Sequence, residues 1–205
     1  MAEQARPLTL ARSRTFPVPG PLGALLPGRG LRRGAVVGVD GTPGAGATSV
    51  AFSLAAAATA AGEWAAAIDL TGTLGVEAAA AAGVALERFP VVRLAHGPAS
   101  RWATVVAALL DGVGLVLAEV PPHVRAGDAR RLVARARERG SVLVVLGDRW
   151  PGSTAVTLVA EGGPWSTPDG EEDRVTVLPV RTLRVQVAGR GEAAQVRHGA
   201  LASSA

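Results

Sequence analysis

The fold of this 205-residue chain is decided by one stretch, Ala35-Val36-Val37-Gly38-Val39-Asp40-Gly41-Thr42-Pro43-Gly44-Ala45-Gly46-Ala47-Thr48. Its first six residues form a brief apolar run that predicts a buried strand, and the glycine-rich segment 41–46 predicts a tight turn. Small residues dominate the next segment, 48–61, and predict a helix that can pack closely against a sheet. Strand, glycine turn and helix in this order indicate the first unit of a parallel sheet.

The turn has the spacing of a phosphate-binding loop, G-x-x-x-x-G-K-[ST], at every position but one. In such a loop the backbone N–H groups around Gly41, Gly44 and Gly46 surround phosphate oxygens, and the hydroxyl at Thr48 holds magnesium. Ala47 stands where the lysine belongs. The loop therefore lacks a charge whose hydrogen bonds are worth roughly 1.5–3 kcal/mol each. Taken alone, the turn is equally well explained as a glycine-rich connection between a strand and a helix.

The rest of the chain alternates strands and helices as far as Leu146 and then changes its pattern. Strands are predicted at 64–70, 91–95, 113–120 and 141–146, and helices at 75–82, 99–110 and 126–139. Residues 154–161 and 174–187 predict antiparallel strands joined by a polar turn at 168–170. The fold class is thus α/β, with a mostly parallel twisted sheet flanked by helices and a C-terminal antiparallel hairpin. We expect a flexible arm at 1–16, one core domain at 17–188 and a flexible tail at 189–205.

Composition excludes several kinds of site and location. The chain has no cysteine, so it has no disulfide or thiolate metal site, and its three histidines do not have a metal-ligand spacing. The N-terminus lacks the apolar core of a signal peptide, and the most apolar stretch, 50–70, is interrupted by Gly62 and Glu63. We therefore expect a cytoplasmic protein. The net charge of +4 permits contact with nucleic acid but does not demand it.

From Val18 onward the sequence resembles the core of the bacterial RecA recombinase and, more closely, the RecA-like mutasome proteins of the ImuA group. The resemblance rests on the lead-in 19–34, on Ala66-Ala67-Ile68-Asp69-Leu70, on a Walker B-like strand at 115–120 and on 142–149, in that order. It covers residues 17–187 and implies a RecA-like P-loop core. The connections 121–128 and 149–153 are too short for the DNA-binding loops of RecA, and its polymerisation segment is reduced to 1–14.

The departures from the RecA pattern imply that the ATPase chemistry is lost. RecA has a catalytic glutamate just after its Ile-Asp strand, and the matching position here is Thr71, which cannot act as a base worth roughly 10²–10⁴-fold in rate. The Walker B carboxylate falls at Glu119, which is longer than the usual aspartate. We expect no catalytic residue, no metal site and no required cofactor. The vestigial nucleotide-binding set is Gly41, Gly44, Gly46, Ala47, Thr48 and Glu119, and whether ATP and magnesium still bind stays open.

By the same resemblance, the chain is expected to be an accessory or scaffold protein, not an enzyme, in DNA-damage-induced error-prone translesion synthesis. Its implied partners are an ImuB-like Y-family protein and an error-prone C-family polymerase, with recruitment to the nucleoid during the SOS response. Two alternatives stay open. One is an NTPase in which Arg32, Arg33 or an arginine from a neighbouring chain replaces the lysine. The other is a DNA-binding repair protein of the RecA superfamily.

Two further groups of residues are candidates for contact with DNA or a partner. Arg130, Arg131 and Arg135 lie on the arginine-rich helix 126–139, where they could bind phosphates or form an ordinary solvated outer face. Trp150 and Trp165 lie in segments rich in glycine and proline, where a large aromatic side chain is hard to bury, which makes both candidates for an interface. Trp64 and Trp102 are predicted to pack in the core or at its rim.

Overall fold

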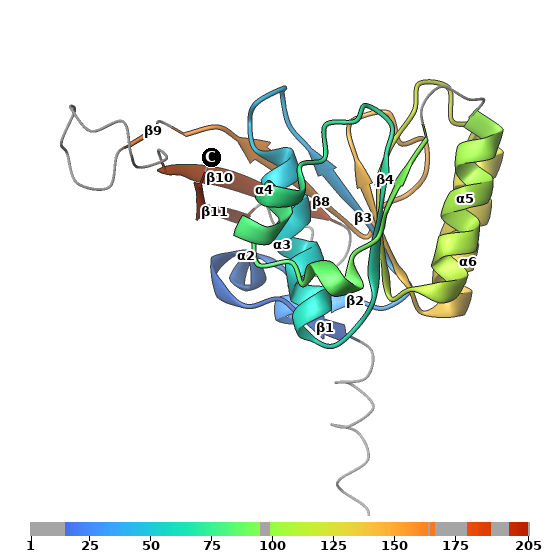
Figure 1. The fold of residues 1–205 in the computed structure, drawn as a ribbon, viewed down its shortest axis with the longest axis horizontal. Helices are drawn as coiled ribbons and strands as arrows, with labels where there is room; N and C mark the ends of the chain where they lie inside the picture. The colour runs from blue at the N-terminus through green and yellow to red at the C-terminus, as the bar shows by residue number, and fades with distance from the viewer. Residues whose placement is uncertain (1–14, 95–98, 164, 167–179, 190–196, 205) are drawn as a thin grey trace, which may run out of the picture.

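The computed structural model describes residues 15–94, 99–163, 165–166, 180–189 and 197–204, and it shows a mixed sheet with helices on both faces (Figure 1). The strands of this sheet follow the order β11-β10-β8-β3-β7-β6-β4-β5, with β9 beside β10. Their bounds are β3 Val36–Asp40, β4 Ala65–Asp69, β5 Val91–Arg93, β6 Leu115–Glu119, β7 Val142–Leu146, β8 Val156–Glu161, β9 Trp165–Ser166, β10 Val180–Gly189 and β11 Arg197–Ser204. A separate two-stranded ribbon pairs β1, Thr15–Pro17, with β2, Gly30–Arg32.

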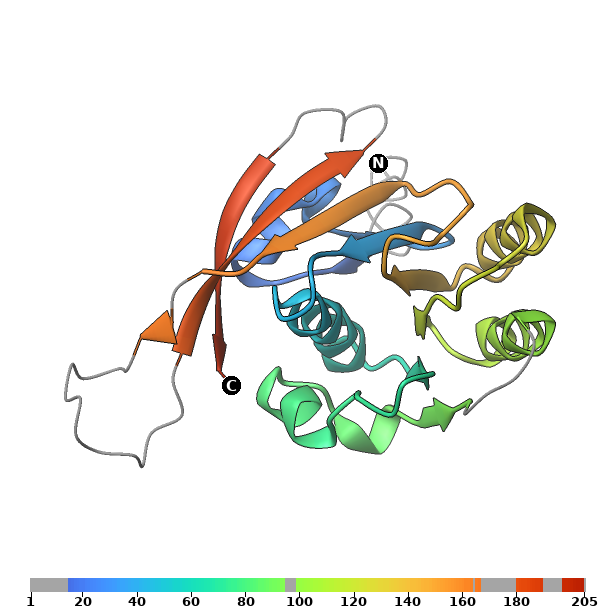
Figure 2. The same ribbon diagram turned by 90° about the horizontal axis from the view of Figure 1, so that it is seen from above.

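Helices cover the sheet in two layers, which Figure 2 shows from above. The helices are α2 Gly20–Leu25, α3 Ala47–Ala60, α4 Val76–Ala81, α5 Ala99–Gly112 and α6 Ala126–Arg139, with short 3-10 turns η1 Pro27–Arg29 and η2 Leu86–Arg88. The views place α3 and α4 on one face of the sheet and α5 with α6 on the other.

Alternation along the strands sends neighbouring side chains into two different cores. Val37 and Val39 of β3 pack in the core with α2 and α3, whereas Val36 packs in the core with α5 and α6. The same alternation holds in β6, where Leu117 joins the first core and Val116 the second. Continuous apolar strands are the expected signature of a sheet that is covered on both faces.

The predicted alternation of strands and helices is confirmed through β7. Helix α6 has the predicted bounds, and α3 begins and ends one residue earlier than expected. Strand β5 is shorter than expected, because it ends at Arg93. Trp102 is buried in the second core, as predicted, but the prediction for Trp64 is wrong, since 51% of this residue is exposed.

The C-terminal part confirms the predicted antiparallel pairing, which joins β8 to β10, and corrects the expectation for the tail. Strand β8 pairs in parallel with β3 on one side and antiparallel with β10 on the other, so it joins the hairpin to the main sheet. The expected flexible tail is in part a strand, because β11 pairs antiparallel with β10 from Arg197 to Ser204. The predicted turn at 168–170, the start of the strand predicted at 174 and most of the N-terminal arm lie outside the described residues.

Candidate functional site

The glycine-rich loop lies between the carboxyl end of β3 and the first residue of α3. Gly44 and Gly46 have φ angles of 78° and 96°, which L-residues with a side chain rarely adopt. A Cβ atom at Gly41 would lie 2.8 Å from the carbonyl oxygen of Ala160, so that position also requires glycine. The loop encloses a hollow of about 360 Å³, which Thr48, Leu146 and Gly147 help to line. The backbone thus has a shape that could receive a small anion.

The charges around this hollow are wrong for a phosphate. Ala47, in place of the lysine, packs against the first core, and none of the side chains that line the hollow is cationic. Asp40 lines it instead and accepts a hydrogen bond of 2.7 Å from the N–H of Gly41. Sequence reasoning missed Asp40, because the loop pattern starts one residue after it. Its carboxylate would repel a phosphate at the place where an active loop attracts one.

Neither Arg32 nor Arg33 can replace the missing lysine within the chain. Both precede β3, whereas the glycine loop follows it, and the five residues of β3 separate the two ends by roughly 13 Å. Arg33 is also engaged elsewhere, since its guanidinium lies 2.6 Å from the carboxylate of Glu63 and 4.0 Å from the ring centroid of Phe16. The alternative in which one of these two arginines serves the loop therefore gains no support from their positions, and an arginine from a neighbouring chain stays open.

Glu119, the expected magnesium-binding carboxylate, is used to tie two strand ends together. It ends β6 and accepts hydrogen bonds from the backbone N–H groups of Leu70, at 2.6 Å, and Thr71, at 3.1 Å, just after β4. The hydroxyl of Thr71 donates to the same carboxylate at 3.0 Å. Next to it, the buried Asp69 accepts from the N–H groups of Gly72 and Thr73. Thr71 and Glu119 therefore meet in a structural clamp, a contact that the sequence did not predict.

The clamp predicts a measurable contribution to stability. Replacing Glu119 with alanine leaves three donors without their acceptor, and hydrogen bonds to a charged group are worth roughly 1.5–3 kcal/mol. We expect Glu119→Ala to lower the free energy of urea unfolding by about that amount, and Glu119→Gln by less. The matched control is the exposed Glu87, which lies at the opposite edge of the sheet from Glu119. Glu87→Ala should change the free energy of unfolding by under about 0.5 kcal/mol. Equal midpoints for both positions would contradict the clamp.

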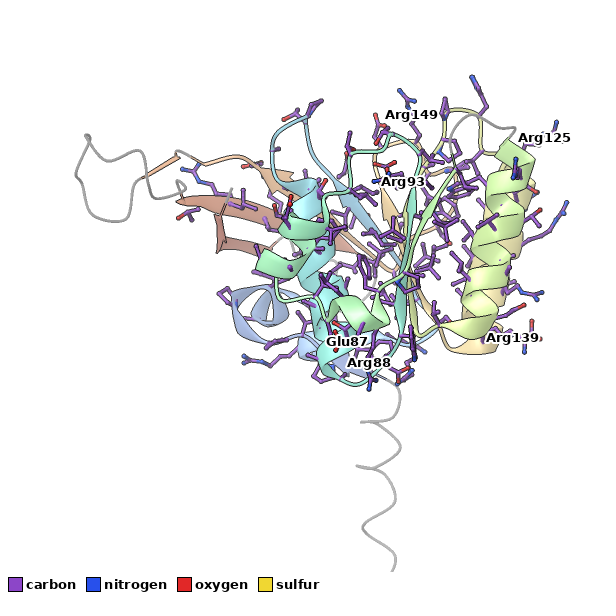
Figure 3. The ribbon with its side chains drawn as sticks, in the orientation of Figure 1. Glu87, Arg88, Arg93, Arg125, Arg139 and Arg149 are labelled. Atoms are coloured by element: carbon purple, nitrogen blue, oxygen red, sulfur yellow. The ribbon has the colours of Figure 1, made fainter. Side chains whose placement is uncertain are left out.

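A larger cleft of about 1100 Å³ opens beside the loop, at the carboxyl edge of the sheet. It is lined by the segments that follow β3, β4, β5, β6 and β7, together with Val159 of β8. Ligands of open α/β sheets bind in this position, outside the carboxyl ends of the strands. Figure 3 shows Arg93 and Arg149 at this edge and Glu87, Arg88 and Arg139 at the other. The cleft includes Gly41 and Glu119 from the vestigial nucleotide-binding set and Thr71 from the position of the missing base. Asp148 and Arg149 also line it and were not predicted.

Three of the five arginines of α6 lie beside carboxylates. Arg135 donates to Asp111 of α5 at 2.7 Å through Nε, and Arg139 reaches the same carboxylate at 3.0 Å. The hydrogen bond from Arg135, with the attraction of both cations, lowers the pKa of Asp111, and Asp111 in turn raises the pKa of Arg135. Arg131 lies 3.9 Å from Asp128. Arg130 is exposed on this helix. Through its ion pair with Asp111, Arg135 therefore links α6 to α5.

Trp150 is not the free aromatic side chain that its loop suggested. It is half-buried, packs against the second core and meets Trp102 edge to face with ring centroids 6.4 Å apart. Trp150 thus holds the loop after β7 onto α5, and its role at an interface stays a prediction. Trp165 belongs to β9, and its side chain lies outside the described ones.

Comparison with known proteins places this site within a family. Residues 24–152 match the MT3502 N-terminal domain, a match that includes the glycine loop, the clamp and α6. The chain belongs to the MT3502 N-terminal domain family. It is also 32% identical over 148 residues to the uncharacterized protein Rv3395c of Mycobacterium tuberculosis, an alignment that covers 71% of each chain. The strands from β8 onward lie beyond the part that matches the MT3502 N-terminal domain.

Two structural features are absent from the described part of the chain. No helix there is long and apolar enough to span a bilayer. No three histidine, aspartate or glutamate side chains gather there in an arrangement that could hold a metal ion.

Proposed function

We propose that this chain is a RecA-like protein of the ImuA group that does not hydrolyse ATP and acts by binding other proteins. The observation that carries the proposal is the loop after β3, which has the glycine spacing of a phosphate loop and encloses a hollow. It carries Ala47 in place of the cation and adds the carboxylate of Asp40. A loop with this charge does not stabilise a triphosphate, and still less the charge that builds up when one is cleaved.

Two further features of the site support the loss of catalysis. Thr71 supplies no carboxylate to activate water, and its hydroxyl is engaged with Glu119. Glu119 in turn accepts three hydrogen bonds from the end of β4, which leaves it less available to hold magnesium through water. Neither of the arginines weighed as substitutes for the lysine lies at the loop. A catalytically inactive fold that retains a well-packed core is suited to scaffolding.

The proposed process is error-prone translesion synthesis after DNA damage, with an ImuB-like Y-family protein and an error-prone C-family polymerase as partners. Support comes from the resemblance to the ImuA group and from the order of glycine loop, Ile68-Asp69 strand end and Glu119 strand within a parallel sheet. We place the protein in the cytoplasm, recruited to the nucleoid. The DNA-binding alternative loses one of its candidate contacts, because Arg135 is paired with Asp111, whereas Arg130 and Arg131 stay exposed.

Mutagenesis in the source organism tests this proposal. Deleting the gene should reduce the mutation frequency after ultraviolet damage to that of undamaged cells, and the wild-type gene should restore it. The gene with Thr48→Ala should restore it equally, because the loss of a magnesium-binding hydroxyl disables an ATPase but leaves a binding protein intact. Damage-induced mutation that persists in the deletion strain would refute the role in translesion synthesis. Failure of a folded Thr48→Ala protein alone would show that nucleotide is used.

A further inference from the structure

The cleft at the carboxyl edge of the sheet has many apolar side chains in its lining. Besides the exposed Pro43 and Pro122, its apolar lining consists of six side chains, Leu70, Leu94, Val120, Pro121, Leu146 and Val159. All six are half-buried, so each keeps surface that is open to solvent. Three of them, Leu70, Leu94 and Val120, also pack on the second core, which holds them in place. Apolar surface gathered in one concave place typically marks a binding site.

The charged groups of this cleft are opposite in sign to the chain as a whole. Asp40, Glu119 and Asp148 contribute three carboxylates against the one guanidinium of Arg149, whereas the whole chain has a formal charge of +4. Arg149 lies 4.0 Å from Asp148, and neither Asp40 nor Glu119 forms an ion pair with a described residue. The uncompensated charge therefore lies near the glycine loop, and it favours a cationic ligand over a phosphate.

The size of the cleft suits a peptide. At about 1100 Å³ it is slightly larger than the usual range for small-molecule sites, and it is open along the loops that follow five strands. In an extended peptide, alternate side chains point in opposite directions. Apolar side chains can then enter the cleft, while long arginine side chains reach the carboxylates at its rim.

We propose that this cleft binds a short extended segment of a partner protein, in which arginine alternates with branched aliphatic residues. The inference adds a location and a partner chemistry to the proposed binding role. It does not depend on translesion synthesis, since the cleft would bind such a segment in any pathway. It assigns a use to the place where the P-loop nucleotide would have been bound.

A synthetic probe tests the proposal directly. The probe is a fluorescein-labelled nonapeptide in which leucine and arginine alternate, and its fluorescence anisotropy is followed as the full-length protein is added. Two matched peptides replace either every arginine with glutamate or every leucine with serine. We expect the first probe to bind and both matched peptides to bind at least about tenfold more weakly, because each loses one of the two complementary features.

Variants locate the binding. Asp40→Asn combined with Asp148→Asn keeps the shape of both side chains and removes two carboxylates, so the affinity should fall about 2- to 30-fold. Thr42→Trp, at an exposed lining position, should obstruct the cleft and abolish binding. Glu87→Gln removes a carboxylate at the opposite edge and should leave the affinity unchanged. Thermal unfolding of each variant shows whether it is folded.

Several results would overturn the proposal. The first is that the leucine–arginine peptide does not bind. The second is that the serine peptide binds as tightly as the leucine–arginine peptide. The third is that a folded Thr42→Trp variant binds the probe as tightly as the wild type. If ATP binds more tightly than the probe, the cleft is a nucleotide-binding site and not a peptide-binding site. A wild-type dimer in sedimentation that dissociates with Thr42→Trp would show that a second copy of the chain occupies the cleft. Each of these outcomes is separate from the mutation-frequency test, which can succeed or fail independently.

Discussion

The purified protein is expected to release phosphate from ATP no faster than a buffer blank, and the Ala47→Lys variant is expected to do no better. The substitution returns a cation to the loop, but Thr71 still offers no base, and the missing base alone is worth roughly 10²–10⁴-fold in rate. Asp40 would also pair with the new lysine and divert it from a phosphate. Malachite-green detection of phosphate, with magnesium present, measures the rate.

Binding and hydrolysis should separate in this experiment. A fluorescent ATP analogue is expected to bind Ala47→Lys/Asp40→Asn more tightly than the wild type, because the double change gives the hollow a net positive charge. Asp40→Asn alone keeps the acceptor for the N–H of Gly41 and serves as the control. Turnover by the wild type, especially turnover per chain that rises with protein concentration, would instead indicate an arginine supplied by a neighbouring molecule.

Removing residues 190–205 is expected to destabilise the fold by at least about 2 kcal/mol, which is roughly 4–8 °C in Tm for a chain of this size. The deletion removes β11, which pairs with β10 over eight positions, and uncovers an edge beside the buried Leu183, Val185 and Val187. It also removes the contact between Gly199 and Leu25 of α2. Differential scanning calorimetry measures the change, and an uncovered edge strand predicts aggregation.

A point variant separates loss of pairing from loss of length. Gly199 lies opposite Val185, and Gly199→Pro keeps the chain length while it removes a backbone donor from the strand. We expect Gly199→Pro to lower the Tm, as the deletion does. Deleting residues 1–13, which lie ahead of β1, should leave the Tm close to that of the full chain. If the chain without 190–205 unfolds at the wild-type temperature, β11 does not contribute to the cooperative fold.

Local patterns were enough to predict most of the elements. Helix α6 was predicted with its observed bounds because arginines alternate with Leu132 and Ala136 at helical spacing, and the strands of the main sheet were apparent as apolar runs between turns. Strand β11 was missed because its small residues carry no period-two pattern. It exists through pairing with β10, a contact that no local window contains.

The site shows the same division between local and distant information. The glycine spacing predicted the loop, and the residue types Ala47 and Thr71 predicted its chemical deficit. The clamp between Glu119 and Thr71 joins residues 48 positions apart in the sequence, and Trp150 is held by the distant Trp102. Both depend on which strands and helices become neighbours.

By itself, the sequence determined the spacing of apolar residues along each helix and strand, the glycines that let the loop turn and the absence of a lysine anywhere in the chain. Only the tertiary structure decided that Asp40 lines the loop, that Glu119 is engaged with β4 and that six aliphatic side chains meet in one cleft. The physical reason is that propensity and charge belong to single residues, whereas a cleft and its field arise where strand ends from distant parts of the chain are brought to one edge.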